Sequence, residues 1–164
     1  MPVGAGLLVS SLPLAVVPIP PGSPAASLLL PALTLVTWTL FVLVWMYATR
    51  LPAMKAARMR PDPNAIRGEQ MSTLPASVRW KADNYNHLLE QPTIFYAVVF
   101  AAVLLAEPGP LDLALAWTYV GLRVVHTFVQ TLVNKIEVRF SLFILSTFAL
   151  MGLTVRTLLA ALGS

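Results

Sequence analysis

Cysteine is absent from the 164-residue sequence, and this excludes disulfide bonds, thiolate nucleophiles and zinc sites built on cysteine. Charged residues are scarce as well: they make up 11% of the chain, whereas soluble domains carry about a quarter. Apolar residues take their place, at 57% of the sequence, and the mean hydropathy is +0.76. This balance predicts a protein whose solvent is lipid.

Four apolar stretches have the length of about 20 residues that is needed to cross ~30 Å of hydrocarbon. They cover residues 27–49, 84–106, 111–134 and 138–161. The last three are joined by short connections, so neighbouring helices are expected to be antiparallel. The sequence therefore predicts an all-α membrane protein in which residues 27–161 form one four-transmembrane-helix bundle. Within the first stretch, Pro31 is expected in the first helical turn, where its missing N–H matters least.

Residues 1–26 form an apolar N-terminal segment that carries no charge and is rich in proline. Prolines at this density interrupt regular structure, so the segment is expected to be irregular or to lie in the membrane interface. A cleaved signal peptide is the alternative, although the positively charged start that such peptides carry is missing.

Lysine and arginine are concentrated in residues 50–83, and Lys135 and Arg139 flank the connection between the last two stretches. Because basic loops stay on the cytoplasmic side, both termini are expected on the opposite side, in a membrane such as the bacterial inner membrane. The preference of basic loops for the cytoplasmic side is enough to explain the positive charge of loop 50–83. Binding of anionic lipid or of an anionic ligand by this loop is the alternative. The basic residues are not interleaved with aromatics on one surface, so no nucleic acid partner is expected.

Ionisable residues at membrane depth cost several kcal/mol unless they find partners, so they are candidates for function. In the second stretch a polar stripe at helical spacing contains Asp83, Asn86, His87 and Glu90. In the third stretch the corresponding stripe contains Arg123, His126, Thr127, Gln130 and Asn134. Antiparallel packing brings Glu90 and Arg123 to similar depths, which predicts an ion pair between them. Such a pair can equally serve only to hold helices together. Arg156 is expected to extend to the interface.

No zinc-protease, phosphate-loop or serine-hydrolase motif occurs, and no metal site is expected. Cationic and hydrogen-bonding groups that face inward from a cytoplasmic opening suit an anionic, water-soluble co-substrate, while the membrane supplies a lipophilic one. Conjugation of a thiol such as glutathione is one reaction of this kind. Transport of protons or ions along the polar stripe is an alternative.

These residues resemble the MAPEG family, the membrane-associated proteins of eicosanoid and glutathione metabolism. Arg123-Val124-Val125-His126-Thr127 is similar to the family's R-V-x-H-T element, and Arg139 stands where the family has a further arginine. The resemblance implies a homotrimer that binds glutathione between protomers and acts as a transferase or peroxidase on lipophilic electrophiles. It implies that Arg139 polarises the thiol, that Asn86, Glu90 and Arg123 shape the glutathione site, and that His126 braces it.

The chain departs from the family pattern at several of these positions. Asp83 and Asn86 stand where the family has arginines, and His87 stands where it has asparagine. Gln130 replaces a tyrosine, and Phe140 and Phe143 replace the serine and tyrosine of some members. A non-catalytic binding or scaffold protein of the same fold is therefore the second hypothesis, and a small ion or proton conduit is the third.

Overall fold

The structure is a computed structural model that describes residues 19–60, 62–66, 68–105 and 108–163. Within these ranges the regular elements are all helical: α1 (Pro24–Ala56), α2 (Glu69–Ser72), α3 (Ala76–Leu105), α4 (Pro110–Phe128), the π-helical turn η1 (Val129–Val133) and α5 (Ile136–Leu162). η1 continues α4 directly. Most of the predicted N-terminal segment, residues 1–18 of 1–26, lies outside the described residues.

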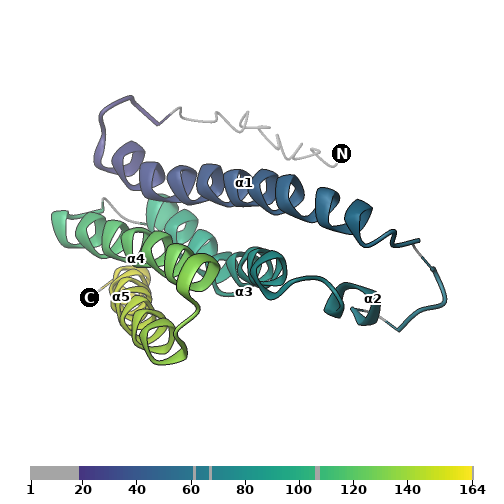
Figure 1. Cartoon of the computed structure of the whole chain (residues 1–164). Coiled ribbons are helices and arrows are strands. Elements are labelled where there is room, and N and C mark those ends of the chain that lie inside the picture. The colour runs from purple at the N-terminus through teal and green to yellow at the C-terminus, as the bar shows by residue number, and fades with distance from the viewer. Residues whose placement is uncertain (1–18, 61, 67, 106–107, 164) are drawn as a thin grey trace, which may run out of the picture.

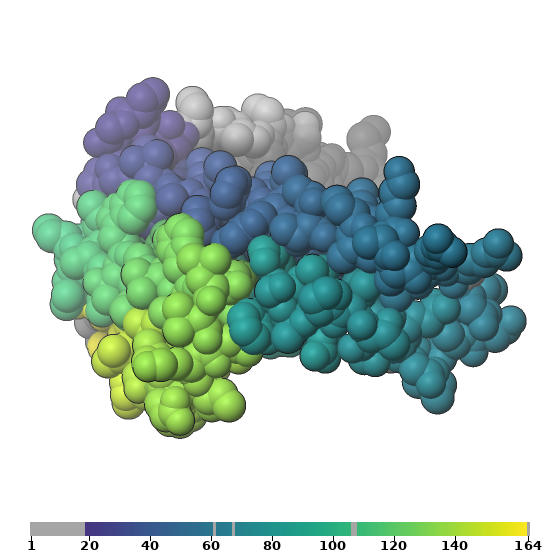
Figure 2. Space-filling model, in the orientation of Figure 1, coloured from purple at the N-terminus to yellow at the C-terminus, as the bar shows by residue number. Residues whose placement is uncertain are grey.

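The long helices pack as a bundle with a small extension at one end. α1 lies against α3 and α4, and α5 packs against α4 and α3 (Figure 1). The short helix α2 lies beyond the N-terminal end of α3, away from the C-terminal end of the chain (Figure 1). In the space-filling view, the segment around α2 projects beyond the packed helices (Figure 2). The predicted helical bundle is therefore present, with α2 added at one end.

The core of the bundle comes from apolar residues that recur at helical spacing. On α1 the buried positions Leu28, Leu35 and Val42 are seven residues apart, which keeps them on one side of the helix. The aromatic rings of Phe95 on α3 and Tyr119 on α4 stack with their centroids 4.5 Å apart. Both rings are fully buried, so they join α3 to α4 at the centre of the molecule.

The outer faces of the helices are also apolar. α1, α3 and α5 are the helices in the described part of the chain that are long and apolar enough to cross a membrane. Large apolar side chains such as Leu33 and Phe148 remain 59% and 63% exposed on these helices. Exposed apolar surface on this scale is suited to lipid or to another protein chain rather than to water. α4 is shorter and carries Asp112, Arg123 and His126, which lower its hydropathy.

Two helices extend further than hydropathy alone indicates. α1 runs through Pro52 to Ala56, and α3 begins at Ala76, so both enter the basic loop predicted over residues 50–83. The prediction that Pro31 lies in the first turn is wrong, because α1 already begins at Pro24. Ser23 caps this start by accepting a hydrogen bond from the backbone N–H of Ala26 at 3.2 Å. Pro31 is consequently buried inside the helix.

Asp112 holds the start of α4 and connects it to α5. Its Oδ2 accepts a hydrogen bond from the backbone N–H of Gly109 at 2.8 Å, which caps the helix. The same carboxylate accepts two hydrogen bonds from the Arg156 guanidinium, one of them from Nη2 at 3.2 Å. Arg156, which is predicted to extend to the interface, thus also has a carboxylate partner on the neighbouring helix.

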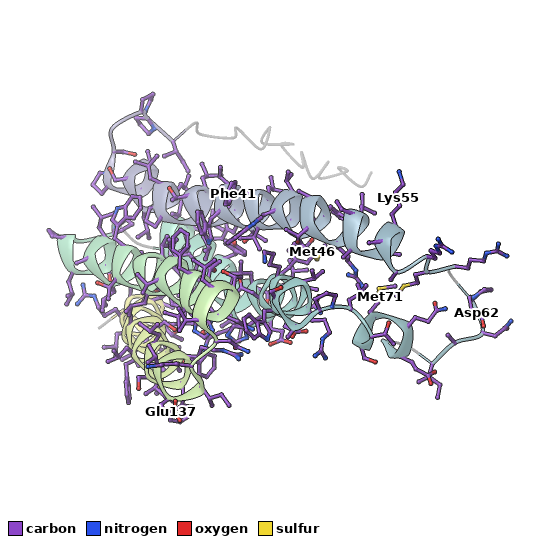
Figure 3. The ribbon with its side chains drawn as sticks, in the orientation of Figure 1. Phe41, Met46, Lys55, Asp62, Met71 and Glu137 are labelled. Carbon is purple, nitrogen blue, oxygen red and sulfur yellow. The ribbon has the colours of Figure 1, made fainter. Side chains whose placement is uncertain are left out.

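Replacement of Asp112 by alanine is expected to lower the thermal stability of the protein. Loss of the cap costs about 0.5–2 kcal/mol, and Arg156 loses its partner at the same time. Thermal unfolding in detergent measures the effect. Glu137→Ala is the matched control, because Glu137 also lies in a first helical turn, that of α5, but is exposed there (Figure 3). Equal midpoints for the two variants would contradict the role of Asp112.

Candidate functional site

Arg123 on α4 is the largest fully buried side chain in the described part of the chain, with 1% of its surface exposed. Its Nη1 lies 3.0 Å from Nε2 of His87, and its Nη2 donates to the backbone carbonyl of His87 at 3.0 Å. The guanidinium carbon also lies 5.8 Å and 5.9 Å from the ring centres of Tyr119 and Phe143. Aromatic rings at this distance stabilise a cation, so Arg123 is held by α3, α4 and α5 together.

His87 connects the buried Arg123 to Glu90 on the surface. Because arginine can only donate, Nε2 of His87 must accept, and the ring proton is therefore on Nδ1. Nδ1 lies 3.3 Å from Oε2 of Glu90, whose side chain is 71% exposed. Among the described residues, the ion pairs involve His87 with Glu90 and Arg156 with Asp112, so the predicted direct pair of Glu90 with Arg123 is wrong. The imidazole of His87 occupies the space between them.

A second buried polar group lies one helical turn further along α4. Nε2 of His126 lies 3.1 Å from Oε1 of Gln130, which also accepts a hydrogen bond from Nδ2 of Asn84 at 3.0 Å. Since Oε1 only accepts, the proton of His126 is on Nε2 and its Nδ1 carries a lone pair. Nδ1 is buried and has no hydrogen-bond partner in the described structure. The rings of His126 and His87 lie 4.9 Å apart, so the two polar groups are neighbours.

Arg139 approaches from the beginning of α5. Its Nη1 donates to Oδ1 of Asn134 at 2.6 Å, and Asn134 adopts a left-handed conformation with φ 55°. Asparagine tolerates this conformation better than most residues, and here it ends the π-helical turn η1 and starts the turn into α5. The Nε–H of Arg139 is buried and has no hydrogen-bond partner among the described residues.

An open cavity of about 390 Å³ lies between α3, α4 and α5. One part of its wall is polar, formed by His87, His126 and Arg139, and the other part is apolar, formed by Ile136, Phe140 and Phe143. The ring of Phe143 lies 5.5 Å from that of His87, which brings the two parts of the wall together. A cavity of this size and composition fits a small molecule with one polar and one apolar end.

The family model of the MAPEG family matches residues 28–159, which is most of the chain. The chain belongs to the MAPEG family. With α1, α3 and α5 able to cross a membrane, it is an integral membrane protein of the kind associated with glutathione and eicosanoid metabolism. Comparison with curated proteins and with solved structures gives no match.

The five site residues predicted from the MAPEG resemblance fall in different places. His126 and Arg139 line the same cavity, and Arg123 lies buried behind His87. Glu90 contacts His87 from the exposed surface, whereas Asn86 lines a separate cavity near α2. No group of three or more metal-ligating side chains is found in the described ranges.

Two residues that connect these polar side chains were not predicted to do so. His87 contacts Arg123, Glu90 and the ring of His126, and Gln130 joins η1 to α3 through Asn84. Both had been identified in the polar stripes and as departures from the family pattern. Their position on those stripes, one turn from Glu90 and from His126, was the signal that they face the same interior.

Proposed function

We propose that this MAPEG protein joins glutathione to lipophilic electrophiles at the cavity between α3, α4 and α5. The observation that carries the proposal is that His126 and Arg139 line one cavity and that each has a buried nitrogen without a partner, Nδ1 of His126 and Nε of Arg139. An acceptor and a donor on adjoining residues of one wall suit a thiol, which gives up a proton and gains a negative charge, once the side chains turn toward it. Ile136, Phe140 and Phe143 supply apolar surface for the second substrate.

In the proposed reaction, the glutathione thiol loses its proton to Nδ1 of His126, and the Nε–H of Arg139 donates to the thiolate that forms. The sulfur then attacks the electrophilic carbon and the leaving group departs with the electron pair of the broken bond. His87 keeps the cationic Arg123 in place behind the cavity, where its charge also favours the thiolate.

The environment of Glu90 supports a proposal about assembly. Its side chain is 71% exposed although it lies within α3, one of the helices able to cross a membrane. A carboxylate facing lipid would be costly, so a neighbouring chain or a cytoplasmic opening must cover it. We propose a homotrimer of protomers with four membrane-spanning helices, α4 with η1 being the fourth. Basic loops would face the cytoplasm and both termini the other side, as in a bacterial inner membrane.

The test is an assay of the purified full chain in detergent with glutathione and a chromogenic aryl halide. Formation of the conjugate above the non-enzymatic rate is the expected result, together with a higher unfolding temperature when glutathione is added. An absence of conjugate combined with an unchanged unfolding temperature would overturn the proposal. Omission of the protein, with all other components kept, is the control.

A further inference from the structure

A second cavity, of about 370 Å³, lies where α1 ends and where α2 and α3 begin. Its polar wall is formed by Arg50, Ser72, Arg79, Asp83 and Asn86. Met71 contributes to the apolar part of the wall, and it lies on the side of α2 that faces α1 (Figure 3). This cavity includes neither His126 nor Arg139, so it is distinct from the one proposed for glutathione chemistry.

The charged side chains of this cavity do not take part in the polar contacts that hold the described helices together. No hydrogen bond or ion pair joins the side chains of Arg50, Arg79, Asp83 and Asn86 to any other described residue. Lys81, between them in sequence, behaves differently: its Nζ donates to the carbonyl of Ser77 at 2.8 Å and lies 5.3 Å from the ring centre of Trp45. Two guanidinium groups, a carboxylate and an amide thus surround one cavity and remain available to a ligand.

The position of the cavity along the helices places it at the edge of the apolar layer. Arg50 directly follows the uncharged stretch 27–49 of α1, and Arg79 and Asp83 lie within the five residues before the apolar stretch that begins at residue 84 of α3. In a membrane protein this boundary coincides with the level of the lipid head groups. The ligand present there at the highest concentration is the head group of a phospholipid.

We propose that this cavity binds the head group of an aminophospholipid. Guanidinium groups bind phosphate oxygens through paired hydrogen bonds, so Arg50 and Arg79 are suited to the phosphodiester. The carboxylate of Asp83 is suited to the ammonium group, and the amide of Asn86 can accept from it. The cavity thus offers two positive charges and one negative charge. A head group that carries both a phosphate and an ammonium group matches these charges better than a head group that carries only the phosphate. The proposal goes beyond glutathione chemistry and does not depend on it.

Native mass spectrometry of the full chain released from detergent micelles tests the proposal. Phosphatidylethanolamine is expected to remain bound in preference to phosphatidylglycerol. Arg79→Gln is expected to weaken retention of both lipids about tenfold or more, because a charge-assisted contact to phosphate is lost. Asp83→Asn is expected to abolish the preference for phosphatidylethanolamine while phosphate binding remains.

Lys55→Gln is the matched control, since it removes the same charge from an exposed side chain that points away from α2 (Figure 3). Equal lipid retention in Arg79→Gln and Lys55→Gln would overturn the proposal. Displacement of the lipid by an equal concentration of phosphoethanolamine would also overturn it, because the site would then recognise a soluble phosphate ester. Displacement by glutathione would overturn it as well and would assign the cavity to the glutathione site. None of these outcomes depends on whether the protein conjugates glutathione.

Discussion

Arg139→Ala is expected to lower kcat for glutathione conjugation by about 10²–10³, the loss seen when one donor to a developing negative charge is removed. The reason is that Arg139 lines the 390 Å³ cavity and that its Nε–H is a buried donor without a partner among the described residues. The side chain of Arg139 is not part of the apolar core, so the unfolding temperature is expected to change little. Steady-state kinetics and thermal unfolding of the same preparation measure both effects.

Asn134→Gly is the matched control for Arg139→Ala. Glycine accepts the left-handed backbone at this position, so the variant removes the 2.6 Å hydrogen bond to Arg139 and leaves the turn intact. A smaller loss of kcat is expected, because Arg139 keeps its charge and its place beside the cavity. Unchanged kcat in Arg139→Ala, with the protein still folded and still conjugating, would remove Arg139 from the proposed mechanism.

His87→Leu is expected to destabilise the protein by about 1.5–3 kcal/mol, which is the contribution of a hydrogen bond to a charged group. The substitution removes the nitrogen that accepts from Nη1 of Arg123, and the backbone carbonyl of residue 87 remains as the hydrogen-bond acceptor of the buried cation. Thermal or chemical unfolding in detergent measures the loss. Glu90→Ala is the control, with an expected cost below about 1 kcal/mol because its side chain is 71% exposed.

The double variant His87→Leu/Arg123→Met separates this explanation from a simple packing defect. When the cation is replaced by an apolar side chain, no buried charge is left without a partner, so stability is expected to return toward that of the original protein. The two substitutions are thus expected to be strongly non-additive. Additive losses would contradict the idea that His87 acts by accepting from Arg123.

The helical bundle could be predicted because it depends on long runs of apolar residues. The described residues of the stretches 27–49, 84–106 and 138–161 fall within α1, α3 and α5, and the stretch 111–134 falls within α4, η1 and the residue that ends η1. Helix ends were harder to predict, since Arg50 and Pro52 interrupt the apolar pattern but not α1. Hydropathy reports where a chain meets lipid, whereas the helix continues as long as backbone hydrogen bonds can form.

Side-chain partners at the site could be predicted only in part. Spacing along α3 and α4 correctly indicated that Glu90, Arg123 and His126 belong to one polar region. It could not show that His87 fills the gap between Glu90 and Arg123, because helical spacing gives the face of a residue but not the rotamer of its side chain. The pairing of Asp112 with Arg156 was missed for a related reason: the two residues are 44 positions apart in the sequence.

The π-helical turn η1 also restricts how the length of this segment can change. A π-helical turn holds one residue more than an α-helical turn, so deletion of a single residue within Val129–Val133 would allow α4 to continue as a regular α-helix. Because the wider turn takes up its extra residue locally, the residues after the deletion would keep nearly the same orientation about the helix axis relative to those before it. A deletion within the regular part of α4 has no such outlet and would rotate every following residue by about 100°. Relatives with the same site should therefore tolerate a difference of one residue within η1 more readily than a difference of one residue within α4 before His126.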